Sequence, residues 1–347
     1  MFSIVRNWIS PDLGIDLGST TTRVYVQGRG VVLEIPSALA IDVGSDQIIE
    51  VGEAAERYLG HRAGKVMVVG PLKNGRIVDV DIAAAFLRHC IEKVFPRQLW
   101  RKSTRPRAVI TVRRGVTEVE KCVMELAAYK AGMGDTFLLE APMAAAIGAG
   151  LPVTENFGGM VVEIGGHACR TAVISEAGII ADRTCPGGDV FDLCVLSHMG
   201  SAYNMAIDAR TAEMVKTTIG SVSPVGQKTD MEVFGEDLES GLPRKVTVTS
   251  EEIRRALGGQ ALFIVKNVLE VIRESAPRFS KELREQGIVL TGGGSLLRGL
   301  DELLAKETGL KVVRAEVPAS SAIEGVGMVL KELVKGNLVG NCHCSYE

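Results

Sequence analysis

The sequence predicts an α/β protein built from two similar halves around a central cleft. Short runs of β-branched residues alternate with helical stretches along the chain, a pattern typical of helices packed on mixed sheets. Two strand-turn-strand segments share an acid followed by glycine: one includes Asp16 and opens the first half, and the other includes Glu163 and opens the second. The chain has 347 residues, enough for two domains of about 100 to 200 residues each.

Hydrophobic and capping patterns predict the elements of the first half in order. Strands are expected at 13–26 and 31–42, joined by Gly28-Arg29-Gly30. Thr117-Glu118-Val119-Glu120 has the spacing of a capping box, which begins a helix, and Gly132 ends that helix. The other expected elements are a helix at 82–94, strands at 108–112 and 136–140, and a short helix at 143–148.

The second half begins after a turn-forming stretch. Residues 151–159 contain Pro, Asn and Gly and mark the boundary, because the second acid-glycine hairpin follows immediately. The polar stretch 223–241 is expected to be an exposed excursion that ends in a strand at 245–248, and Ser250-Glu251-Glu252 begins a long helix. The remaining expected elements are strands at 160–163, 171–174, 179–183 and 288–291, and helices at 189–199 and 209–215.

These boundaries divide the chain into four parts. Residues 1–11 are an amphipathic segment, 12–150 the first domain, 151–334 the second domain, and 335–347 a polar tail. The C-terminal helix either stays in the second domain or returns to the first.

Composition argues against several classes of protein. The net charge is −3 and basic residues are matched by acids along most of the chain, so no nucleic-acid partner is expected. Seven cysteines are scattered in a chain with no secretory signal pattern, which predicts reduced thiols in the cytoplasm. No apolar run reaches the roughly 18 residues that a spanning helix needs.

Both hairpins carry groups suited to holding phosphate. Glycine lets backbone N–H groups approach anionic oxygens, hydroxyls add donors, and an acid holds a metal ion or its waters. The acids that could do so are Asp16 and, through water, Glu163. The phosphate ligands expected from the first hairpin are Asp16, Gly18, Ser19, Thr20 and Thr21. The alternative is a retained turn that binds no ligand.

Three further motifs support a nucleotide site in the second half. They are a glycine pair that opens a helix, a Glu and a Lys three apart on one helical face, and a glycine turn that follows a strand and can present backbone to an adenine or ribose. With the second hairpin, the expected ligands are Glu163, Gly165, Gly166, His167, Gly187, Gly188, Glu213, Lys216, Gly292, Gly293, Gly294 and Leu297.

With these motifs in this order, the chain resembles the actin, Hsp70 and sugar-kinase superfamily, and within it the MreB-like bacterial actins. The resemblance covers roughly 12–334 and extends to the segments 71–79, 115–121 and 142–150. It implies a ribonuclease H-like, two-domain actin fold around a central nucleotide cleft. It also implies ATP or ADP with Mg²⁺ as cofactors, and antiparallel double filaments on the inner membrane.

The second phosphate loop departs from that family. Where the family usually has Asp-Ile-Gly-Gly-Gly-Thr, residues 163–168 read Glu-Ile-Gly-Gly-His-Ala. Ala168 lacks the hydroxyl, and Ala141 lacks the carboxylate, that in the family orient the attacking water. Losing both removes general-base assistance worth about 100-fold to 10,000-fold in rate, so hydrolysis is expected to be very slow or absent. Glu140 and His167 are the candidate replacements.

Arg113-Arg114 is a further departure, at a place where the family usually has Pro-Ser at the mouth of the cleft. The two cations either balance nucleotide phosphates or a partner's acids, or belong to a solvated loop. The sequence leaves both interpretations open.

Both tryptophans lie in short amphipathic segments, and Trp favours membrane interfaces. The second segment is also flanked by cations, each of which contributes about 1 kcal/mol near an anionic leaflet. The expected membrane residues are Phe2, Val5, Trp8, Ile9, Phe95, Leu99 and Trp100. The alternative is that the tryptophans pack on the protein's own surface.

The sequence therefore predicts a nucleotide-binding structural protein rather than a turnover enzyme. Its expected partners are itself, as a homopolymer, the inner membrane surface, and membrane proteins of cell shape or wall synthesis. Its expected location is the cytoplasm, peripheral on the inner face of the cell membrane. Two alternatives stay open: a hydrolysing filament ATPase with substituted catalytic groups, and a non-polymerising membrane adaptor.

Overall fold

The computed structural model describes residues 12–58, 65–95, 105–224 and 228–334. Contacts divide the chain into two compact units: unit 1 contains Met1–Gly148 and Ser320–Glu347, and unit 2 contains Ala149–Ala319. The division falls between Gly148 and Ala149, against a predicted boundary after residue 150. The C-terminal helix belongs to unit 1, which is the second of the two arrangements considered for it.

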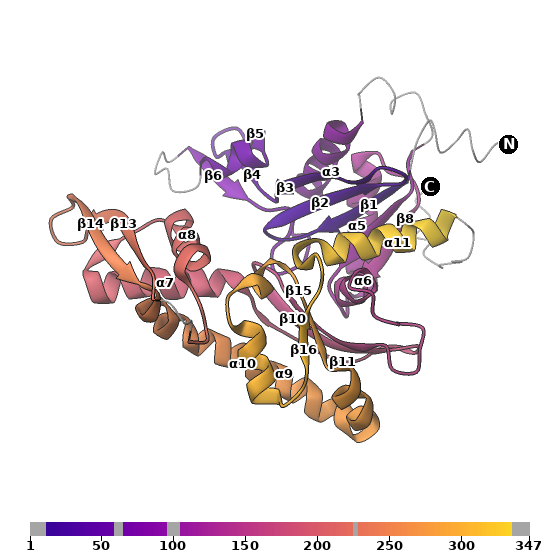
Figure 1. Ribbon diagram of the computed structural model, residues 1–347. Coiled ribbons are helices and arrows are strands. Elements are labelled where there is room, and N and C mark those ends of the chain that lie inside the picture. Colours follow the sequence, from indigo (N-terminus) through magenta and orange to yellow (C-terminus); the bar gives the residue numbers. More distant parts are fainter. Residues whose placement is uncertain (1–11, 59–64, 96–104, 225–227, 335–347) are drawn as a thin grey trace. The chain divides into compact units, whose positions relative to one another are not determined.

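The main sheet of unit 1 has five strands, in the order β3-β2-β1-β7-β8 (Figure 1). These are β1 (Leu13–Leu17), β2 (Thr21–Val26), β3 (Gly30–Pro36), β7 (Ala108–Val112) and β8 (Thr136–Glu140). Strand β2 is antiparallel to both β1 and β3, whereas β1, β7 and β8 are parallel. The central strand β1 therefore has an antiparallel neighbour on one side and a parallel neighbour on the other.

Four longer helices accompany this sheet: α3 (Val80–Val94), α5 (Glu118–Ala131), α6 (Ala141–Gly148) and α11 (Ser321–Val334). Side chains alternate along a strand, so Leu13, Ile15 and Leu17 of β1 enter one core together with residues of α3 and α5. Gly14 faces the opposite way, toward α11, where a Cβ built on it would lie 2.7 Å from Val326 Cγ1. Helix α11 thus covers the second face of the sheet.

Helices α6 and α11 pack with their backbones in contact. A Cβ built on Gly148 would lie 1.7 Å from the carbonyl oxygen of Ser321, and one built on Gly325 would lie 1.9 Å from that of Ala144. No side chain fits at either position. These two glycines allow the C-terminal helix to complete unit 1.

Local signals set the helix ends as expected. Thr117 and Glu120 form the predicted capping box of α5, and Gly132 ends this helix in the left-handed conformation, with φ 107. The strand predicted at 31–42 is instead broken into β3 and β4. Strand β4 belongs to a separate sheet of order β5-β4-β6, accompanied by a short helix. The elements of this part are β4 (Leu39–Asp42), β5 (Gln47–Val51), α2 (Glu53–Glu56) and β6 (Val66–Val69).

The main sheet of unit 2 repeats that of unit 1. Its strands are β9 (Gly159–Ile164), β10 (Ala168–Ser175), β11 (Gly178–Pro186), β15 (Ile288–Thr291) and β16 (Val312–Arg314), in the order β11-β10-β9-β15-β16. Again the first three are antiparallel neighbours and the last three are parallel. The predicted duplication is confirmed, because β9 corresponds to β1 and β15 to β7.

The rest of unit 2 is largely helical, and it corrects one prediction. The stretch expected as an exposed excursion contains a regular strand, β13, which pairs with β14. Its polar side chains are mostly exposed, so no apolar run marked it. Among the residues described, no helix has the length and apolar character needed to cross a membrane. The other elements are α7 (Gly188–Tyr203), β12 (Met205–Ala206), α8 (Ala209–Ile219), β13 (Asp230–Asp237), β14 (Pro243–Thr249), α9 (Ser250–Gln286), η1 (Gly293–Leu296), α10 (Leu300–Thr308) and η2 (Pro318–Ser320).

The contact between α6 and α11 predicts that Gly325→Ala lowers the free energy of unfolding by about 1 to 3 kcal/mol, the usual cost of overpacking. Urea denaturation measures this. The control is Gly259→Ala in α9, where nothing lies within 4 Å of an added Cβ. That change should stabilise the protein by up to about 1 kcal/mol, because Ala is the better helix former. Equal midpoints for Gly325→Ala and the wild type would contradict the described packing.

Candidate nucleotide site

The first acid is held by the parallel neighbour of its strand. Asp16 lies near the end of β1, and its Oδ1 accepts a hydrogen bond of 2.8 Å from Thr111 Oγ1 on β7. The same hydroxyl accepts a 3.1 Å bond from the backbone N–H of Leu17. Thr111 is buried, whereas Asp16 is half-buried. The strand order therefore fixes a carboxylate at the base of the first hairpin.

The turn of this hairpin requires glycine at one position. A Cβ on Gly18 would lie 2.3 Å from the carbonyl oxygen of Thr21, so only glycine closes the turn this tightly. Ser19 and Thr21 are half-buried and Thr20 is exposed. Within the described part of the chain, the hydroxyls of these three residues make no hydrogen bond. The structure thus gathers all five predicted ligands of the first hairpin, with three hydroxyl groups available to a ligand.

The second hairpin meets two other glycine motifs. The carbonyl oxygen of Gly165 accepts a 2.9 Å hydrogen bond from the backbone N–H of Gly188. The carbonyl oxygen of Gly166 accepts a 2.7 Å hydrogen bond from the backbone N–H of Asp189. A Cβ on Gly187 would lie 2.5 Å from the Gly165 oxygen. The start of α7 is therefore packed directly on the turn of the second hairpin.

The third glycine motif reaches the same loop from β15. A Cβ on Gly292 would lie 2.3 Å from the carbonyl oxygen of Ile164, and one on Gly294 would lie 2.5 Å from Ile164 Cγ2. Gly293 differs, since nothing lies within 4 Å of its Cβ position. Leu297, also expected at the nucleotide, is 9% exposed and packs in the core of unit 2. Its side chain is therefore a core group, which leaves Gly293 as the open position of this turn.

The second acid has a different partner from the first. Glu163 is buried, and its Oε2 accepts a 3.2 Å hydrogen bond from Arg170 Nη1 on β10. Thr291, which pairs with Glu163 across β15 and β9, has a buried Oγ1 with no hydrogen-bond partner among the residues described. The charge of Glu163 is thus balanced inside unit 2.

His167 has a carboxylate neighbour that the sequence did not indicate. Its Nδ1 lies 3.5 Å from Oδ2 of Asp189, in the first turn of α7. Both side chains are about half exposed, at 50% and 48%. The pair is separated in sequence, and only the packing of α7 on the loop brings the two residues together.

Lys216 lies next to Asp192 rather than next to Glu213. Lys216 Nζ contacts Asp192 at 2.8 Å between α8 and α7, and both side chains are largely buried. Burial raises the pKa of Asp192, and the hydrogen bond from Lys216 opposes this rise. Glu213 is exposed on the same helix. The sequence did not indicate the pair of Lys216 and Asp192, because Asp192 belongs to another helix.

The positions expected to govern hydrolysis offer no unpaired acid. Ala141 begins α6 and is buried, and Ala168 begins β10. Glu140 Oε2 lies 2.9 Å from Arg114 Nη1. The candidate replacement carboxylate is therefore paired with a cation of its own chain.

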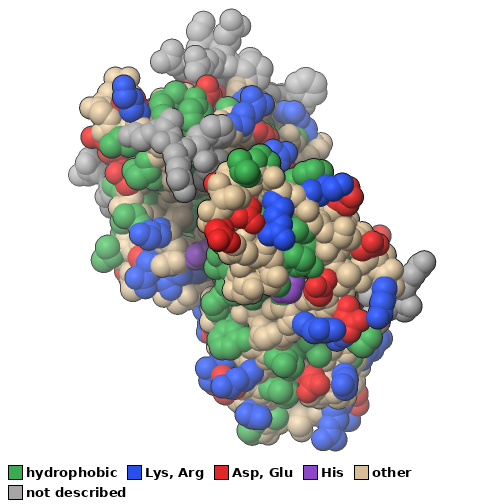
Figure 2. Space-filling view, turned by 90° about the vertical axis from the view of Figure 1, so that its left-hand side faces the viewer, with side chains coloured by type: hydrophobic (Ala, Val, Ile, Leu, Met, Phe, Trp, Pro, Cys, Tyr) green, Lys and Arg blue, Asp and Glu red, His purple; other side chains and the backbone are tan. Residues whose placement is uncertain are grey.

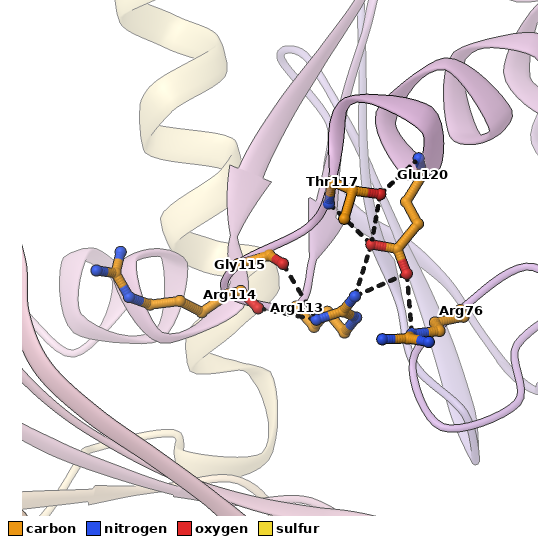
Figure 3. A network of polar contacts seen from close by, with 6 residues as sticks. All are labelled: Arg76, Arg113, Arg114, Gly115, Thr117 and Glu120. Atoms are coloured by element: carbon orange, nitrogen blue, oxygen red, sulfur yellow. Dashed lines mark hydrogen bonds and ion pairs between the residues drawn. The ribbon is translucent and has the colours of Figure 1, made fainter.

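Arg113 is also paired within unit 1 (Figure 3). Its Nη2 donates to both carboxylate oxygens of Glu120, at 2.7 and 2.6 Å, and Arg76 Nε lies 2.9 Å from the same carboxylate. The hydrogen bond from the Thr117 backbone, followed by that from Arg113, lowers the pKa of Glu120 to about 2. Arg113 and Arg114 thus each bind an acid of this chain, an arrangement that the sequence did not indicate.

The membrane prediction falls mostly on 1–11 and 96–104, which lie outside the described residues. Phe95 is described, and it is partly buried against the core of unit 1. On the face shown in Figure 2, acidic and basic side chains lie beside one another. This mixture agrees with the small net charge of −3.

Two sheets of the same strand order, each with an acid-glycine hairpin at its central strand, define an actin-like protein. The crystal structure of MreB5 of Spiroplasma citri bound to ADP matches with a TM-score of 0.89 and 30% identity, covering 95% of this chain and 99% of that one. The same protein bound to AMPPNP matches with a TM-score of 0.88. The MamK double helical filament, at 18% identity and a TM-score of 0.75, shares the fold.

Sequence comparison narrows this class. The family profile described as MreB/Mbl protein matches residues 10–337. The cell shape-determining protein MreB of Escherichia coli (strain K12) is 40% identical over 336 residues, covering 95% of this chain and 96% of that protein. The cell shape-determining protein Mbl of Bacillus subtilis (strain 168) is 37% identical over 325 residues, covering 93% and 97%. The chain belongs to the MreB/Mbl family.

The network around Glu120 predicts a pH dependence of stability. Because its pKa is lowered from 4.5 to about 2, its contribution is complete above about pH 4.5 and is lost as the pH falls toward 2. Glu120→Gln should therefore lower the thermal midpoint at pH 7, and the gap to the wild type should close in acid. Glu118→Gln is the control, since that side chain is 85% exposed on the same helix. A gap of constant size from pH 7 to pH 3 would contradict the role of the charge.

Proposed function

We propose that this chain is an ATP- or ADP-binding bacterial actin of the MreB type that forms filaments and acts in cell shape determination. The observation that carries the proposal is the first hairpin, with Asp16 held by Thr111 and three hydroxyls available, in a chain of the MreB/Mbl family. The related MreB5 was solved with ADP and with AMPPNP, which supports the choice of ligand.

The residues of the first hairpin suit Mg²⁺ together with a nucleotide. Mg²⁺ usually takes one or two carboxylates, with waters and phosphate oxygens completing its coordination. Asp16 supplies one such carboxylate. Among the residues described, no three His, Cys, Asp or Glu side chains are grouped closely enough to hold an ion alone. Waters and, when nucleotide is bound, phosphate oxygens would therefore complete the coordination beside Asp16, and the bound ion would offset the negative charge of the phosphates.

We infer that ATP hydrolysis is weak or lost. Ala141 and Ala168 offer no group to orient a water, and Glu140 is bound to Arg114. Filament stability would then depend on nucleotide binding more than on turnover.

A slow filament ATPase is the second candidate, and one observation favours it. His167 lies 3.5 Å from Asp189, and an imidazole oriented by a carboxylate is a common general base. In that case His167→Ala would abolish phosphate release, whereas Glu140→Gln would leave it unchanged.

Self-association and membrane attachment complete the proposal. The MamK double helical filament shares the fold, and the family includes cell shape-determining proteins of two bacteria. The segments around Trp8 and Trp100 supply apolar and cationic groups for the inner membrane surface. We propose antiparallel double filaments there, which position membrane proteins of wall synthesis.

Asp16→Asn should weaken binding of a fluorescent ATP analogue by about 10-fold to 100-fold in the presence of Mg²⁺, since a charged partner of the metal is lost. The side chain keeps its size and can still meet Thr111. The matched control is Asp230→Asn, an exposed aspartate at the start of β13. Equal affinities for Asp16→Asn and the control would rule out the first hairpin as the phosphate site.

Sedimentation with anionic liposomes tests the filament proposal, with phosphate release recorded in the same tubes. Polymer on liposomes is expected with ATP and with AMPPNP, and negligible phosphate is expected with ATP. A Trp8→Ala/Trp100→Ala variant should lose liposome binding but keep nucleotide binding. Robust phosphate release would favour the ATPase, and nucleotide binding without any polymer would favour the membrane adaptor.

A further inference from the structure

The duplication allows the two hairpins to be compared position by position. In unit 1 the acid Asp16 pairs across the hairpin with Arg23, and in unit 2 the acid Glu163 pairs with Arg170. Each acid therefore has an arginine as its neighbour on the antiparallel strand. The two halves nevertheless use that arginine differently.

The difference begins on the third strand. Arg23 lies opposite Glu34 of β3 and binds it at 2.9 Å, so it is occupied on the side away from Asp16. Arg170 lies opposite Thr184 of β11, which has no charge to offer. Its guanidinium contacts Glu163 instead, at 3.2 Å, and both side chains are largely buried, at 21% and 11% exposure. One residue on an outer strand thus accounts for the choice of partner.

The threonine on the neighbouring parallel strand also differs between the two units. In unit 1 the hydroxyl of Thr111 donates to Asp16. The corresponding residue of unit 2 is Thr291, whose hydroxyl oxygen is buried and has no partner among the described residues. A polar atom in this position is costly to leave unpaired. Glu163 therefore binds Arg170, whereas Asp16 accepts a hydrogen bond from the corresponding threonine.

We propose that Arg170 is a positioning residue that holds Glu163. Its guanidinium supplies, at the second hairpin, the positive charge that a divalent cation would otherwise bring to Glu163. A carboxylate already paired with a guanidinium attracts a divalent cation less, and the guanidinium repels that cation. Nucleotide binding then depends on Mg²⁺ through Asp16, with no contribution from Glu163. This inference rests on the proposed function, because it concerns the same nucleotide.

The test is to give Arg170 the partner that Arg23 has. Thr184 is exposed, so Thr184→Glu places a carboxylate opposite Arg170 without altering the core. Thr184→Gln is the matched control of equal length without charge. Affinity for AMPPNP is measured in excess Mg²⁺ and in EDTA. The affinity in Mg²⁺ is divided by the affinity in EDTA, and this ratio is compared between the variants. Thr184→Glu should raise this ratio by about tenfold or more, since it releases Glu163.

A second arm uses the metal alone. Arg170→Met leaves Glu163 buried and unpaired, so its thermal midpoint should fall well below that of the wild type. Mg²⁺ without nucleotide should then raise the midpoint of Arg170→Met by several degrees, more than it raises the wild type, because it binds the folded protein. Arg170→Lys keeps the charge and should behave as the wild type does.

The outcomes separate the two proposals. Equal ratios for Thr184→Glu and Thr184→Gln, or no extra effect of Mg²⁺ on Arg170→Met, would overturn the role of Arg170. If no variant binds AMPPNP in either condition, the proposed function fails. The response of Arg170→Met to Mg²⁺ would still decide whether Arg170 neutralises Glu163.

Discussion

Everything at the candidate site depends on a central strand with an antiparallel neighbour on one side and a parallel neighbour on the other. The antiparallel neighbour supplies the hairpin turn with its glycine. The parallel neighbour ends beside the acid and brings a threonine to it, Thr111 in unit 1 and Thr291 in unit 2. Carboxyl ends of parallel strands gather at one edge of a sheet, where ligands of α/β proteins usually bind, and this strand arrangement places the acid and the hairpin turn of each unit at that edge.

Units 1 and 2 share this strand arrangement but differ in how their charged side chains are paired. In unit 1, Arg113 and Arg114 bind Glu120 and Glu140, so these cations are neutralised by their own chain. In unit 2, Arg170 does the same for Glu163. Arg113 and Arg114, which the sequence offered as possible partners of phosphate, therefore bind acids of their own unit. Backbone N–H groups and hydroxyls are left as the main donors to an anion.

Signals that act over a few residues were readable from the sequence, and those that act between strands were not. The capping box at Thr117 and the succession of strands and helices along each half follow from local spacing and hydrophobic runs. Strand β13 was missed because acidic residues interrupt its short apolar stretch and Val233 is its one buried residue. The pairs His167–Asp189 and Arg170–Glu163 depend on register and helix packing, which spacing along the chain does not fix.

The contact of α6 with α11 has a consequence for biosynthesis. Unit 2 is continuous in sequence, whereas unit 1 is finished only by residues after Ser320. The face of the first sheet around Gly14 and Tyr25 awaits α11, so it stays uncovered while the intervening residues are translated. A nascent chain thus leaves this part of the sheet, including the Tyr25 ring, uncovered for most of its time on the ribosome, when chaperones and self-aggregation compete for it. Unit 2 can fold earlier, although it begins later.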